Sequence, residues 1–150
     1  MNNKENVNAI TAPLANARIA FIGCGVMAES IIAGLLRREL VTPGQIFGSH
    51  PRSARRNELY TKYGMQMVED NREAALAAHP EAPQDGSMVI LGVKPQRMGK
   101  VLEELKGAIH QDQLVVSIVA GAKIETIAGE LLHPLSSAPC QIHRHKLARG

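Results

Sequence analysis

The fold of this chain is decided by the stretch Arg18–Ala28, which reads RIAFIGCGVMA. A short apolar run, typical of a buried strand, meets two glycines and passes directly into a helical pattern. Gly23 permits a tight turn, Gly25 lets a ligand approach the backbone, and the small Ala28 lets the helix pack close to the strand. The helix start offers unpaired N–H groups and the positive end of its dipole to phosphates. The stretch therefore predicts a dinucleotide-binding turn rather than a plain strand–turn–helix.

Strand and helix patterns alternate along the rest of the chain. Apolar runs predict strands at 18–22, 45–49, 65–68, 88–93 and 114–119. Helical spacing predicts helices at 27–39, 53–63, 71–78, 98–105 and 124–132. On the first helix we expect Met27, Ile31, Leu35 and Leu36 to share one face. This alternation predicts an α/β fold, a Rossmann-like doubly wound parallel sheet with helices on both faces.

The composition of the chain argues against several classes of function. A chain of 150 residues suits one domain with a real core. Its two cysteines give no disulfide framework, which is typical of the cytoplasm. The net charge of +3 is carried by the basic residues of the last segment. The sequence contains no basic stripe with interleaved aromatic residues, so it does not predict nucleic-acid binding. No apolar run is long enough to span a membrane, and no spacing of His and Cys indicates a metal site. We therefore expect a small-molecule partner.

Three segments are predicted. Residues 1–16 are polar, lack a signal-peptide pattern and are expected to form a disordered leader. Residues 17–132 are expected to form the dinucleotide-binding domain. Residues 133–150 have no helical or strand period and are expected to form a disordered tail.

The end of the second predicted strand bears on the choice of cofactor. Enzymes that prefer NAD place an acid there for the ribose hydroxyls. This chain has Ser49-His50-Pro51-Arg52 instead, and a hydroxyl with a guanidinium suits a 2′-phosphate. NADP is therefore favoured over NAD, the alternative being a turn with a solvated arginine. Lys94 is either an exposed strand end or a residue at the nicotinamide, and Cys24 is either an activated thiol or a small filler.

From Arg18 to about Leu132 the chain resembles the N-terminal half of pyrroline-5-carboxylate reductase. The resemblance is carried by FIGCGVMAESIIxGL from Phe21, by Ser49, by Asp70-Asn71, by Val93-Lys94-Pro95-Gln96 and by Ser117-Ile118-Val119-Ala120-Gly121. It implies reduction of 1-pyrroline-5-carboxylate to proline with NADPH, the cofactor supplying the hydride. The catalytic residue stays unassigned.

The resemblance also implies the cofactor contacts. Those to the pyrophosphate are Ile22, Gly23, Cys24, Gly25, Val26 and Met27, with Ala28. Those to the adenosine and its 2′-phosphate are Ser49, His50, Arg52 and Asn71. Those around the nicotinamide are Val93, Lys94, Pro95, Ile118, Val119, Ala120 and Gly121.

Members of that family continue with a sixth strand, an M-P-N-T-P segment and an all-helical domain that forms a homo-oligomer and completes the substrate site. The resemblance implies that this chain lacks them. One choice of codons for the tail from Leu135, read one nucleotide out of frame, spells I-V-R-A-M-P-N-T-P-A-Q-I-G. We therefore hypothesise a truncation by a single-base deletion, the alternative being an unrelated natural tail. Three functions remain open: this reductase, a non-catalytic NADP-binding fragment, and an NADP-dependent reductase of another small substrate.

Overall fold

The computed structural model of the protein describes residues 14–79 and 86–131. The predicted tail and most of the predicted leader lie outside these ranges. So does the prediction about a sixth strand, which falls on residues after 131.

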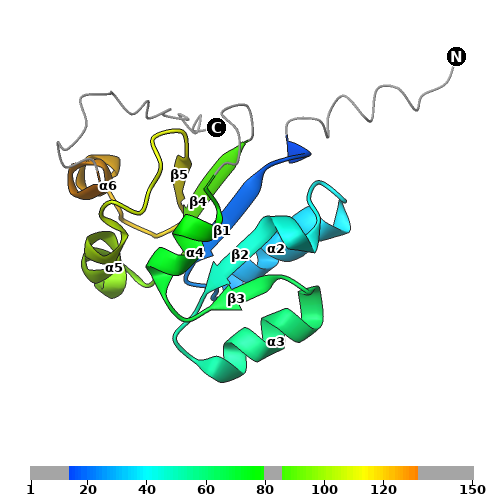
Figure 1. The fold of residues 1–150 in the computed structure, drawn as a ribbon. Coiled ribbons are helices and arrows are strands. Elements are labelled where there is room, and N and C mark those ends of the chain that lie inside the picture. The colour runs from blue at the N-terminus through cyan, green and yellow to red at the C-terminus, as the bar shows by residue number, and fades with distance from the viewer. Residues whose placement is uncertain (1–13, 80–85, 132–150) are drawn as a thin grey trace, which may run out of the picture.

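The described residues form one five-stranded parallel sheet with helices on both faces (Figure 1). The strands are β1 (Arg18–Ile22), β2 (Ile46–Ser49), β3 (Gln66–Val68), β4 (Ser87–Leu91) and β5 (Leu114–Ser117). Their order is β3-β2-β1-β4-β5, with every neighbouring pair parallel. The helices are α2 (Val26–Arg37), α3 (Ser53–Tyr63), α4 (Asn71–Ala77), α5 (Met98–Leu105) and α6 (Ile124–Leu131), with 3₁₀ turns η2 (Pro43–Gln45) and η3 (Pro95–Arg97). The predicted α/β, Rossmann-like doubly wound parallel sheet is confirmed.

Alternation along β1 divides the core into two layers. Ile19 and Phe21 face the layer shared with α2 and α3. Ala20 and Ile22 face the layer shared with α4, α5 and α6. All four are essentially inaccessible to solvent, because a central parallel strand is covered on both sides.

The core face of α2 differs from the prediction at Met27. Ala28 and Ile32 are the fully buried residues of this helix, whereas Met27 is 65% exposed. Ile31, Leu35 and Leu36 pack against the core as predicted. Met27 lies on the same side of α2 as Ile31, but it stands in the first turn, where the core no longer covers the helix.

Two strands end earlier than predicted. β4 stops at Leu91 and β5 at Ser117, two residues short of the apolar runs. The next residues still bond across the sheet: the N–H of Gly92 donates to the Ile22 oxygen at 2.8 Å, and that of Ile118 to the Leu91 oxygen at 3.0 Å. The chain leaves the strand geometry here to form the loops at the carboxyl edge.

The strand order reverses between β1 and β4, because β2 and β3 lie to one side of β1 while β4 and β5 lie to the other. In open α/β sheets ligands bind outside the carboxyl ends of the strands at such a point. Among the described residues, no helix combines the length and the apolar character needed to cross a membrane.

Candidate functional site

The turn after β1 has the geometry that the sequence predicts. Gly23 has φ of +86°, and a Cβ at this position would lie 2.6 Å from Cγ1 of Val93. Only glycine fits both the backbone angle and the close approach of the β4 loop. Gly25 has φ of −80°, and an added Cβ would meet no atom within 4 Å. Gly25 therefore borders open space into which a ligand can come.

The start of α2 offers unsatisfied donors to that space. Gly25 is the N-cap and supplies no side-chain cap. The first-turn N–H groups of Val26, Met27 and Ala28 have no acceptor within the helix. Val26 is 79% exposed, and Met27 is exposed as well. Backbone donors and the positive helix end together suit an anionic phosphate group.

Ser49 ties the glycine turn to the next loop. Its buried hydroxyl accepts the N–H of Gly23 at 3.2 Å and donates to Oδ1 of Asn71 at 2.7 Å. Its backbone oxygen accepts the N–H of Cys24 at 3.0 Å. Nδ2 of Asn71 donates to Oε2 of Glu104 at 2.7 Å. The structure thus places the predicted residues Gly23, Ser49 and Asn71 in one network, in which the Ser49 hydroxyl is already bonded on both sides.

The side chain of Cys24 is not available to a ligand at this site. Its side chain is fully buried, and a Cβ added to Gly48 would lie 2.6 Å from its sulfur. Burial raises the pKa of the Cys24 thiol to about 12, more than the neighbouring Ser49 backbone and Arg55 lower it. The thiol therefore stays protonated and fills space, as the filler interpretation expects.

His50 and Arg52 follow β2 at the same edge. Nδ1 of His50 accepts the backbone N–H of Arg52 at 3.2 Å. Burial lowers the pKa of His50, and the charge of Arg52 adds to this effect, so the imidazole is neutral at pH 7. Arg52 is exposed and is the N-cap of α3. Within the described ranges its side chain forms no ion pair, which leaves a positive charge beside the end of β2.

The ends of β4 and β5 bring the remaining predicted residues to the same edge. Val93 packs against Gly23, while Lys94 and Pro95 are exposed at the start of η3. The side chain of Ile118 lies beside Gly92, whose added Cβ would be 3.4 Å from Cδ1. Ser117 Oγ accepts the N–H of Val119, and Gly121 has φ of +74° in the turn that follows Ala120. These loops border the glycine turn on the side opposite β2.

Three charged residues around the site were missed by the sequence analysis. Arg55 and Glu29 form an ion pair at 2.5 Å beside the glycine turn, and Glu104 bonds Asn71. Arg55 belongs to a run of basic residues after Arg52 and Glu29 to the motif that begins at Phe21, whereas nothing in the sequence singles out Glu104.

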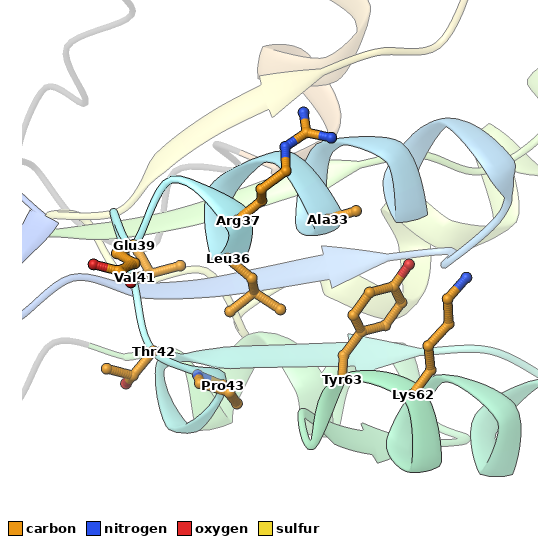
Figure 2. Close-up of a pocket in the computed structure, with 9 residues that line it drawn as sticks. All are labelled: Ala33, Leu36, Arg37, Glu39, Val41, Thr42, Pro43, Lys62 and Tyr63. Atoms are coloured by element: carbon orange, nitrogen blue, oxygen red, sulfur yellow. The ribbon is translucent and has the colours of Figure 1, made fainter.

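A separate groove of about 790 Å³ lies between the C-terminal half of α2 and α3 (Figure 2). Figure 2 shows Tyr63 and Lys62 extending from α3 toward α2, with Leu36 between the helices. None of the predicted cofactor residues lines this groove. It is therefore distinct from the site at the carboxyl edge.

The sequence matches known proteins over most of its length. A pyrroline-5-carboxylate reductase of Pseudomonas aeruginosa is 35% identical over 136 residues, which are 91% of this chain and 46% of that protein. The corresponding enzyme of Escherichia coli is 35% identical over 116 residues, 77% of this chain and 40% of that protein. The chain thus spans less than half the length of these relatives. The predicted resemblance to pyrroline-5-carboxylate reductases is confirmed.

Solved structures of pyrroline-5-carboxylate reductases also superpose on this chain. A pyrroline-5-carboxylate reductase of Coxiella burnetii superposes with a TM-score of 0.66 at 30% identity, over 77% of this chain and 40% of that one. A pyrroline carboxylate reductase of Plasmodium falciparum, solved with NADP bound, superposes with a TM-score of 0.63 at 19% identity, over 79% and 39%. At that identity the second likeness shows the fold alone. A family model described as "NADP oxidoreductase coenzyme F420-dependent" matches residues 18–121. This chain therefore belongs to the family of coenzyme F420-dependent NADP oxidoreductases.

Proposed function

We propose that residues 17–132 form a dinucleotide-binding domain that takes NADP at the carboxyl edge of the sheet. The observation that carries the proposal is the open space at Gly25, next to the exposed first turn of α2. In this proposal the N–H groups of Val26, Met27 and Ala28 hold the pyrophosphate. The pyrophosphate set also includes the backbone of Ile22, Gly23, Cys24 and Gly25.

NADP rather than NAD is proposed from the loop after β2. Arg52 presents a free charge there, and the described loop Ser49–Arg52 contains no carboxylate that would pair with a ribose 2′-hydroxyl. His50 and Asn71 complete the adenosine side. Because Ser49 already uses its hydroxyl to hold Gly23, we assign the 2′-phosphate chiefly to Arg52.

The nicotinamide end is proposed to lie against the loops after β4 and β5. The lining residues are Val93, Lys94, Pro95, Ile118, Val119, Ala120 and Gly121. When bound, NADPH supplies a hydride, and the protein orients the ring and excludes water.

The reaction that we propose is reduction of 1-pyrroline-5-carboxylate to proline. Its support is the similarity to pyrroline-5-carboxylate reductases from two bacteria over most of this chain. The cytoplasmic location expected from the sequence is part of the same proposal, whereas the homo-oligomer is expected of the family's all-helical domain.

Two measurements test the function. The chain has no tryptophan, so cofactor binding can be followed by the fluorescence of the nicotinamide itself on titration with NADPH and with NADH. Turnover is tested by proline formation from NADPH and 1-pyrroline-5-carboxylate, and by growth of a proline auxotroph that expresses the chain. Cofactor binding without proline would assign this chain cofactor binding alone. Turnover of a different imine would assign another substrate, and binding of neither cofactor would contradict the whole proposal.

A further inference from the structure

Arg55 connects the glycine turn to two helices. It lies in the first turn of α3, and its side chain is 13% exposed. Nε donates to the backbone oxygen of Cys24 at 3.2 Å. Nη2 contacts Oε2 of Glu29 at 2.5 Å, and Nη1 contacts Oε1 of Glu58 at 2.9 Å. All three guanidinium nitrogens therefore have a protein acceptor.

Glu29 anchors the other side of this contact. It stands in the first turn of α2, and its carboxylate also receives Nζ of Lys62 at 2.8 Å and the hydroxyl of Tyr63 at 2.9 Å. The bonds from Lys62, Arg55 and Tyr63 lower the pKa of Glu29 from 4.5 to about 2. The carboxylate is thus ionised at neutral pH and stays available to Arg55.

The two residues that Arg55 contacts across the turn, Cys24 and Glu29, lie on either side of the proposed phosphate donors in the sequence. The Cys24 oxygen belongs to the planar peptide that leads into Gly25, so a bond to this oxygen also fixes the Gly25 N–H, which donates to the Gly23 oxygen at 3.0 Å and closes the turn. Glu29 lies four residues after Gly25 and donates its own N–H to the Gly25 oxygen at 3.0 Å. Val26, Met27 and Ala28 lie between the two anchored points. A rigid, forked guanidinium can hold both points at once, which an ammonium cannot.

We propose that Arg55 is a positioning residue, which fixes the glycine turn and the first turn of α2 in the conformation that receives the cofactor diphosphate. The inference rests on the proposed NADP function. Arg55 acts through the turn, whereas Arg52, which is exposed, acts on the 2′-phosphate. Since NADPH and NADH share the diphosphate, the loss of Arg55 affects both cofactors alike.

The test compares Arg55→Lys with Glu58→Gln in the full chain. Lysine keeps the charge but loses the fork, while Glu58→Gln removes only the contact to a half-exposed partner on the same helix. For Arg55→Lys we expect the Kd of NADPH and that of NADH to rise by the same factor, about tenfold. We also expect faster backbone hydrogen exchange over residues 23–28 of the cofactor-free chain. Glu58→Gln should change neither quantity.

Two other outcomes of this experiment would overturn the proposal. A loss confined to NADPH would mean that Arg55 contacts the 2′-phosphate and would overturn the proposal. A lower Tm with unchanged Kd values and unchanged hydrogen exchange at residues 23–28 would show that Arg55 only stabilises the packing of α2 against α3. That result would also overturn the proposal. If Arg55→Lys does not fold, Glu29→Gln takes its place, with a smaller effect expected in the same direction. If the wild-type chain binds neither cofactor, the proposed function fails, and the exchange rates alone decide whether Arg55 orders the turn.

Discussion

The backbone N–H of Gly23 donates to the buried hydroxyl of Ser49 at 3.2 Å, so a side chain at the end of β2 holds the turn at the end of β1. The same hydroxyl donates to Asn71 at the start of α4. The resemblance implies that Ser49 contacts the cofactor. The structure gives this residue a second task, which is to shape the turn that meets the phosphates.

Replacing Ser49 with alanine removes both of these bonds. The N–H of Gly23 and the amide oxygen of Asn71 lose their partner, and we expect a loss of about 1–3 kcal/mol in the free energy of unfolding. Urea unfolding measures it. Ser30→Ala is the matched control, because the Ser30 hydroxyl is exposed and bonds only its own helix at the Val26 oxygen. Equal stability losses in the two variants would contradict the role given to Ser49.

Replacing Gly23 with alanine should destabilise the fold strongly. The new Cβ would overlap Val93, and the alanine would have to adopt a φ of +86°. We expect a combined cost of about 2–4 kcal/mol in the free energy of unfolding. Gly34→Ala serves as the control, since Gly34 lies within α2 with free space around it and alanine favours a helix. Thermal unfolding should give a lower Tm for the first variant and an equal or higher Tm for the second. An unchanged Tm for Gly23→Ala would show that the turn is built differently.

Glu29 predicts a specific acid sensitivity. Its pKa is about 2 in the folded protein and near 4.5 when unfolded, so the unfolded chain takes up the proton first as the pH falls. The contribution of Glu29 to stability is therefore complete above pH 4.5 and is lost between pH 4.5 and about 2. Tm measured over this interval should fall more steeply for the wild type than for Glu29→Gln. Parallel curves would contradict the low pKa.

The local features of the fold are the ones that the sequence predicts well. β1, the two glycines and the buried Ala28 follow one another in the chain, so their pattern contains the turn. α3 is predicted over its full length because Ser53 begins it and Gly64 ends it with φ of +72°. Met27 was placed wrongly, since a helical period does not reveal where the sheet stops covering the helix.

The contacts that hold the site together could not be predicted in this way. Gly23 and Ser49 are 26 residues apart, as are Glu29 and Arg55. Such pairs meet only after β1, α2 and β2 have packed as a unit. A basic run after β2 indicates an anion site, but it does not show that Arg52 stays exposed while Arg55 turns inward to Cys24.

Arg52 is expected to determine the choice between the two cofactors. Arg52→Met removes the exposed charge after β2, and we predict that the Kd of NADPH rises about tenfold while that of NADH stays the same. Arg37→Met is the control, because Arg37 is an exposed arginine on the groove at the far end of α2 (Figure 2). Cofactor fluorescence titrations of both variants decide the matter. An unchanged NADPH-to-NADH ratio in Arg52→Met would remove Arg52 from the 2′-phosphate site.

Gly25→Val asks whether the turn at Gly23–Ala28 holds the NADP phosphates. A valine at Gly25 meets no protein atom near its Cβ and keeps an allowed backbone angle, so the fold should survive while the side chain fills the space for the phosphates. The measurement is NADPH titration of the wild-type chain and Gly25→Val, followed by nicotinamide fluorescence below the Tm of both. Saturable binding by the wild type and none by Gly25→Val is the predicted result. Equal affinity in the two chains, or no binding by the wild type, would show that this turn does not hold the NADP phosphates.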